Sequence, residues 1–67
     1  EEYKALSGAI YTIEVITDPD SPAVAPQRRA IAIDKRGVTV LKGPLSFASE
    51  SKVLIEELKF RINNQLP

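Results

Sequence analysis

The chain lacks four residue types that carry much of protein chemistry. Its 67 residues include no cysteine, histidine, methionine or tryptophan. Without cysteine no disulfide can form, and without cysteine or histidine the thiolate and imidazole ligands of structural metal sites are missing. The usual general base and the usual soft nucleophile of covalent catalysis are absent as well. The sequence therefore predicts a protein that is not an enzyme and that carries no cofactor.

Glycine is also scarce, and the three glycines, Gly8, Gly37 and Gly43, are far apart. No glycine-rich phosphate-binding segment is present. Asp18 and Asp20 have the spacing of the first ligands of a calcium loop, but the glycine and the bidentate glutamate that complete such a loop are missing from the residues that follow. The pair is typical of a turn in which aspartate bonds its own backbone. The sequence predicts no metal and no small-molecule ligand.

Charge of one sign is not in excess, because nine Lys and Arg balance nine Asp and Glu. Zero net charge disfavours a dedicated nucleic-acid binder. No apolar run reaches the roughly 18 residues that a membrane-spanning helix needs, so no membrane insertion is expected. The missing disulfide framework favours a cytoplasmic location, and the compartment is otherwise left open.

The length allows one small domain, residues 1–67. A chain of this size buries only about 60% of the surface that its unfolded form exposes, and it usually needs a staple, a partner or a parent protein. The first residue is Glu1 and methionine is absent. We therefore expect a domain excised or processed out of a longer chain.

In three segments apolar and polar residues alternate, which is typical of strands. In a fourth segment the apolar residues recur with the period of a helix. The strands are expected at residues 9–17, 28–33 and 38–41, and the helix at about residues 49–63. Residues 18–27 contain three prolines, which cannot continue a strand, and are expected to form a flexible loop. The expected fold class is α+β: a three-stranded antiparallel sheet in β-β-β-α order, with the C-terminal amphipathic helix packed on one face.

The turn at residues 34–37 leaves the register of the second hairpin open. Aspartate at its first position and Gly37 at its fourth suit a type I turn that ends in a left-handed residue. A pairing of Ile33 with Val38 gives the cleaner apolar face and is preferred, whereas a glycine bulge pairs Ile33 with Thr39. The preferred register predicts one core made of Ile13, Val15, Ile31, Ile33, Val38, Val40, Leu54, Leu58 and Ile62.

Apolar residues are left over after that core is assembled. On a helical wheel, Val53 and Phe60 lie roughly 160° from the centre of the face formed by the leucines. In the first long strand, Ile10 and Ile16 point away from Ile13. A single helix covers only one face of a sheet. We therefore expect Val53, Phe60, Ile10 and Ile16 to be an interaction surface for a protein partner or for a second copy in a homodimer.

The basic residues support an alternative function. Arg28, Arg29, Lys35, Arg36 and Lys42 are candidates for a basic sheet edge that contacts phosphate groups of a nucleic acid. The same basic residues are also explained without nucleic acid, because charged side chains at an exposed strand edge prevent pairing with another chain. Aromatic residues, which stack on bases, make up only 6% of the chain.

The hairpin at residues 30–41, followed by a helix, resembles segments of several families. It is similar in element order to parts of phosphotyrosine-binding-type domains, periplasmic biopolymer-transport proteins and small single-strand nucleic-acid binders. The resemblance rests on alternation and a turn, and no functional residue is carried over from it. The sequence as a whole predicts a non-catalytic protein–protein interaction or assembly module, with nucleic-acid binding as the alternative.

Overall fold

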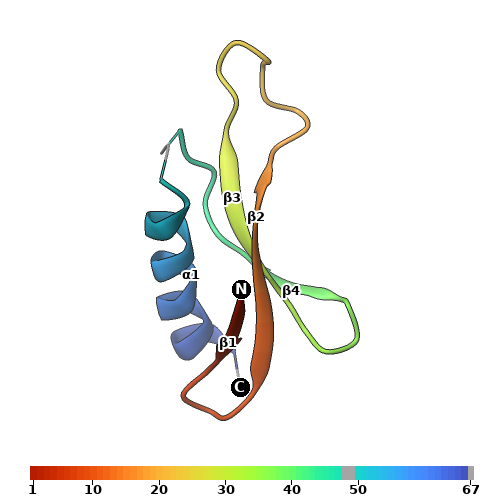
Figure 1. Ribbon diagram of the computed structural model, residues 1–67, viewed down its shortest axis with the longest axis vertical. Coiled ribbons are helices and arrows are strands. Elements are labelled where there is room, and N and C mark those ends of the chain that lie inside the picture. The colour runs from red at the N-terminus through yellow and green to blue at the C-terminus, as the bar shows by residue number, and fades with distance from the viewer. Residues whose placement is uncertain (48–49, 67) are drawn as a thin grey trace.

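The computed structural model describes residues 1–47 and 50–66. Within these residues, four strands, β1 (Glu2–Lys4), β2 (Ile10–Thr17), β3 (Arg28–Ile33) and β4 (Thr39–Lys42), precede the helix α1 (Ser51–Gln65). The strands form one antiparallel sheet in the order β1-β2-β3-β4. The helix packs against β3 and β2, so that the domain has two layers (Figure 1). The α+β class with a C-terminal helix is confirmed, but the expectation of three strands was wrong.

The additional strand, β1, is short and polar. Its central residue, Tyr3, lies opposite Tyr11 of β2. The helix also holds this strand: Asn63 donates a hydrogen bond of 2.8 Å to the hydroxyl of Tyr3. The ammonium group of Lys59 lies 5.2 Å from the centre of the same ring and 2.6 Å from the carboxylate of Glu1. Contacts with residues distant in sequence therefore stabilise a strand that is too short to show alternation.

The core lies between α1 and the face of the sheet that it covers. Leu54, Leu58 and Ile62 supply the helical side, as the four-residue spacing predicted. The sheet side consists of buried residues and of half-buried residues packed against them: Tyr3, Tyr11, Ile13, Val15, Ala30, Ala32, Val40 and Leu41. The small alanines of β3 let the leucines of α1 lie close to the strand. Gly43 meets the same need, since a Cβ there would lie 3.3 Å from the carbonyl oxygen of Ala30 and 3.7 Å from Leu58 Cδ1.

The preferred hairpin register was wrong. Ile33 pairs with Thr39, and the register shifts between Ile33 and Ala32, which lies opposite Leu41. Val40 is thus an extra residue in a β-bulge, and this lets Val40 and Leu41, although adjacent, both pack against the core. Val38, which was expected in the core, is 50% exposed.

The bulge is accompanied by a second correction, to the orientation of β3. Ala30 and Ala32 face the helix, so Ile31 and Ile33 point to the other side of the sheet. Both sets are apolar, and alternation alone does not distinguish them. The expected single core therefore loses Ile31, Ile33 and Val38, while its remaining members pack together.

The helix begins two residues later than expected and ends two residues later. Glu50 occupies the N-cap position without a side-chain capping hydrogen bond. Ser51 is the first helical residue, and its hydroxyl accepts a hydrogen bond from Arg28. The expected first residue of the helix, Ser49, lies outside the described residues.

The proline-rich loop at residues 18–27 is closed by hydrogen bonds. Asp18 donates its amide to the carbonyl of Gln27, and the Ser21 hydroxyl bridges these two residues. An Asp18 carboxylate oxygen accepts the Asp20 amide at 3.2 Å. The turn chemistry predicted for the Asp18/Asp20 pair is therefore present, and the flexibility of the loop stays a prediction.

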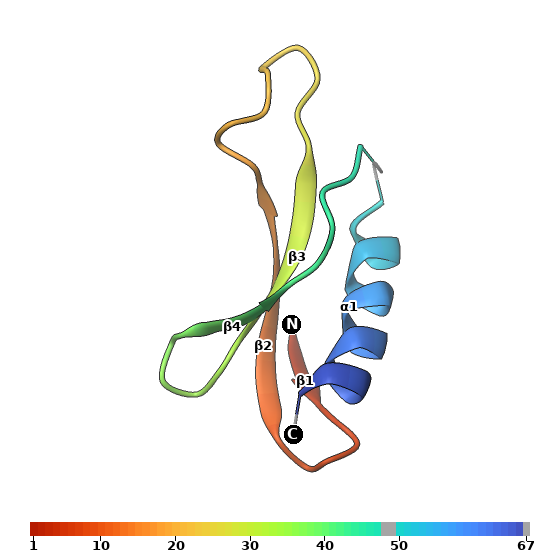
Figure 2. The same cartoon turned by 180° about the vertical axis from the view of Figure 1, so that it is seen from behind.

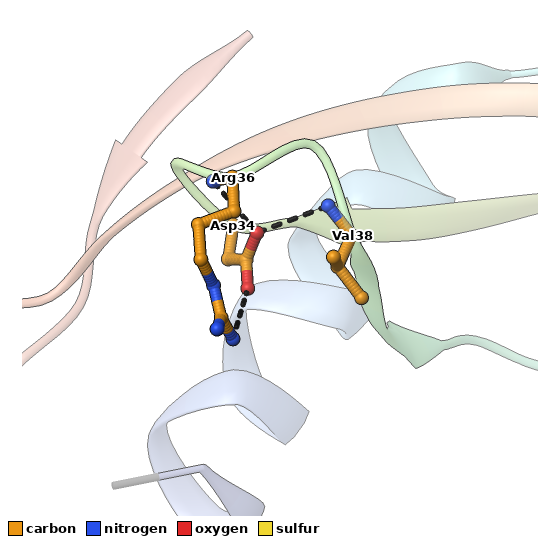
Figure 3. Close-up of polar contacts among 3 residues, drawn as sticks. All are labelled: Asp34, Arg36 and Val38. Carbon is orange, nitrogen blue, oxygen red and sulfur yellow. Dashed lines mark hydrogen bonds and ion pairs between the residues drawn. The ribbon is translucent and has the colours of Figure 1, made fainter.

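The turn between β3 and β4 is organised by the Asp34 carboxylate (Figure 3). One carboxylate oxygen accepts the amides of Arg36 at 2.9 Å and Val38 at 3.0 Å. Gly37 has φ of +83°, as expected for the last residue of this turn. The hydrogen bond from the Val38 amide is the main cause that lowers the pKa of Asp34 below its ordinary value of 3.8, and the contacts with Arg36 add to it.

This lowered pKa predicts a loss of stability in acid. The stabilisation by Asp34 is complete above pH 3.8 and is lost as the pH falls through the lower pKa of the folded state. We expect NMR titration of the carboxyl carbon to give a midpoint below 3.8 in the wild type. Arg36→Gln should keep the midpoint low, because the Val38 amide is the main cause. A midpoint at or above 3.8 in the folded wild type would contradict the role of the turn.

Candidate interaction surfaces

The sheet face turned away from α1 is named the open sheet face. It is formed by alternate residues of all four strands: Glu2, Lys4, Ile10, Thr12, Glu14, Ile16, Arg29, Ile31, Ile33, Thr39 and Lys42. In both views the helix lies on the opposite side of the sheet (Figure 1 and Figure 2). No other helix or strand among residues 1–47 and 50–66 covers this face. It carries four isoleucines, although an uncovered antiparallel face is usually polar.

The isoleucines of the open sheet face differ in how much their own sheet covers them. Ile31, on the inner strand β3, is only 8% exposed. Its cross-strand neighbours are Glu14 on one side and Lys42 on the other. Ile16, at the end of β2, is 37% exposed, whereas Ile10 and Ile33 are half-buried. The isoleucine at the centre of the face is therefore nearly covered, and it has a charged residue on each side across the strands.

The second surface is the outer face of α1. Val53 is 54% and Phe60 is 69% exposed, as the helical wheel predicted. Glu56 and Glu57 lie between them on the same side of the helix by the 100° rotation per residue. Glu57 forms the expected ion pair with Arg61, at 3.4 Å. The outer helix face is thus two separate apolar side chains within an acidic surface.

The four residues chosen from the sequence do not form one site. Val53 and Phe60 lie on the helical layer, and Ile10 and Ile16 lie on the opposite face of the sheet. Ile10 and Ile16 are themselves at opposite ends of β2, about 20 Å apart at 3.3 Å per residue. Ile31 and Ile33, which share the open sheet face with them, were missed because their strand was assigned to the wrong face.

The basic residues are also dispersed. Arg28 lies on the helix side, where its guanidinium donates to the Ser51 hydroxyl at 3.0 Å. Arg29 and Lys42 lie on the open sheet face. Lys35 and Arg36 occupy the turn at the far end of β3, where Arg36 pairs with Asp34 at 3.4 Å. The five cations therefore do not form one continuous basic edge.

A hollow of about 430 Å³ lies at one end of the open sheet face. Its walls are Ile16, Arg29 and Lys42 from the sheet and Asp18, Pro19 and Asp20 from the loop. Arg29 Nε is buried and has no hydrogen-bond partner in the structure. The sequence did not indicate this hollow, because the strand register and the loop conformation together bring its residues into contact.

Among the residues that the structure describes, no three carboxylates are grouped so as to hold a metal ion. In the same part of the chain, no helix is long and apolar enough to span a membrane. The titratable groups with shifted pKa values serve the fold: the hydrogen bond between Lys59 and Glu1 raises the pKa of the lysine and lowers that of the glutamate.

Comparisons with known proteins give no relative for this chain. No family model, no curated protein and no solved structure matches it.

Proposed function

We propose that the chain is a non-catalytic protein–protein interaction or assembly module, which acts as a homo-oligomer or as a domain of a larger protein. The observation that carries this proposal is a sheet with apolar side chains on both faces, of which the described part of the chain covers only one with a helix. Burial of apolar surface contributes about 25 cal/mol per Å². A partner over the open sheet face would therefore stabilise a domain that has no disulfide.

The size of the domain supports the same proposal. A chain this short has a small free energy of unfolding, and one helix packs on its core. Phe60 and Val53 add exposed apolar surface that the core does not use. Single exposed apolar side chains are common on protein surfaces, so Val53 and Phe60 support the proposal only together with the open sheet face.

This proposal predicts that the exposed apolar residues are not needed for folding. Ile16→Thr and Phe60→Glu should each change the free energy of unfolding by less than about 1 kcal/mol, as surface substitutions do. The measurement is urea unfolding at micromolar protein, a concentration chosen to limit self-association. Ile13→Thr is the matched control, because Ile13 lies on the same strand with its side chain in the core. That change should cost more than about 2 kcal/mol.

A large loss of stability in Ile16→Thr and Phe60→Glu would overturn the proposal, since these side chains would then serve the fold. Fluorescence anisotropy with a single-stranded oligonucleotide distinguishes nucleic-acid binding from the proposed protein–protein interaction. An affinity that falls steeply with salt would favour the alternative. The dispersed cations argue against that result.

A further inference from the structure

We infer that the open sheet face binds a second copy of this chain, packed face to face across a two-fold axis that runs along β3. This inference rests on the proposed function and names the partner and the surface. It is carried by one cross-strand row on the open sheet face. In that row Glu14 lies opposite Ile31, and Ile31 lies opposite Lys42.

The row has an acid at one end, an apolar centre and a base at the other end. Neighbouring strands are about 4.8 Å apart, so Glu14 and Lys42 are separated by roughly 10 Å. Among residues 1–47 and 50–66 neither side chain forms an ion pair, and both are exposed. Each charge is therefore available to a group that approaches from above the sheet.

A two-fold axis along β3 makes this row complementary to itself. The rotation places Ile31 over Ile31 of the second copy. It also places Glu14 over Lys42 of the second copy, and Lys42 over its Glu14. The contact between Glu14 of one copy and Lys42 of the other therefore occurs twice, as an isologous interface requires. Two sheets stacked in this way keep their strands within about 30° of each other, as in a β-sandwich.

Arg29 lies on the same strand and face as Ile31, two residues away, and it opposes this arrangement in part. It shares the hollow at the end of the face with Asp18 and Asp20 of its own loop, but no ion pair joins them among the described residues. A two-fold axis along β3 brings the two copies of Arg29 near each other, and this contact between like charges weakens the expected association.

The other surfaces are less suited to a second copy. The outer helix face would bring Glu56 and Glu57 of both copies together, and like charges oppose such a contact. The sheet edges are short: β1 has 3 residues and β4 has 4 residues with a bulge. Short, charged and bulged edges resist strand addition.

The area of the face sets the expected strength of the interaction. The longest strand, β2, has 8 residues. At about 3.3 Å per residue and 4.8 Å between strands, three strands project roughly 26 by 14 Å. Stable interfaces bury about 800 Å² per partner, and the projected area of roughly 360 Å² is less than half of that value, so this interface is of the small, weak kind. We expect dissociation constants in the micromolar to millimolar range.

Charge reversal tests the pairing of Glu14 with Lys42. The variants Glu14→Lys and Lys42→Glu each place like charges opposite one another in the homodimer. Each should weaken self-association by at least about tenfold in sedimentation equilibrium. Mixed in equal amounts, they should form a heterodimer within about threefold of the wild-type affinity, because the acidic row of one variant then meets the basic row of the other.

The controls carry the same changes in charge on the helix. Lys52→Glu and Glu57→Lys, alone or mixed, should stay within about threefold of the wild type. A wild type that remains monomeric at millimolar concentration overturns the inference, and so does a mixture that fails to restore association. If Ile16→Thr and Phe60→Glu leave stability unchanged in that case, the proposed function stands with a different partner; if they destabilise the monomer, it fails as well.

Discussion

Leu58→Ala is expected to cost about 2–5 kcal/mol of unfolding free energy, the range for removing a buried leucine from a packed core. Leu58 is 1% exposed and lies at the centre of the helical side of the core, near Gly43 and Ala30. Its loss leaves a cavity between two elements that cannot collapse without moving the helix. A domain of this size has only a small margin, so the variant should be largely unfolded at room temperature.

Chemical denaturation followed by circular dichroism measures this loss. Val53→Ala is the matched control, because it shortens an aliphatic side chain on the same helix at a position that is 54% exposed. The control should change stability by less than about 0.5 kcal/mol. A loss below about 1 kcal/mol for Leu58→Ala would contradict the packing of α1 on the sheet.

Ala32→Ile is expected to destabilise the domain by about 1–3 kcal/mol or more, because it inserts three carbons into a filled space. Ala32 is fully buried, and its single methyl group faces the leucines of α1. The larger side chain fits only if the helix moves away from β3. Such a movement would also pull Asn63 away from the hydroxyl of Tyr3, which gives a second signal in the NMR spectrum.

The control for this change is Thr12→Ile, which places isoleucine at an exposed position on the open sheet face of the adjacent strand. Thr12 is already β-branched, so only Ala32→Ile gains strand propensity, and this gain acts against the expected destabilisation. Thr12→Ile should stay within about 0.5 kcal/mol of the wild type at micromolar concentration. A neutral Ala32→Ile would show that β3 presents its other face to the helix.

These two changes also mark the limit of what the sequence could predict. The helix, the long strand and the left-handed Gly37 followed from periodicity and turn chemistry. The orientation of β3 did not, because its alternating alanines and isoleucines are apolar on both faces. The choice depends on how closely a helix must approach, and that is a property of the packed structure. Alternation also failed to predict the side-chain directions of β4, because the bulge at Val40 places two adjacent side chains on one face.

The candidate surfaces were predicted in part for the same reason. Val53 and Phe60 were recognised because the fixed rotation per residue of a helix places them away from its apolar face. Ile10 and Ile16 were recognised because successive side chains of β2 point to opposite faces of the sheet. The row of Glu14, Ile31 and Lys42 could not be found without the registers of two hairpins. β1 was missed because three residues are too few for alternation to be seen.

The strand order of the sheet has a consequence for how the chain folds. Each strand pairs with the one before it, so the sheet can form by closing one short loop after another. Such local pairing favours fast folding. The contacts between the helix and the first residues of the chain are not local: Asn63 bonds Tyr3, 60 positions away, and Lys59 pairs with Glu1. We therefore expect the C-terminal end of the helix and the first strand to lock together late, after the three hairpins have formed.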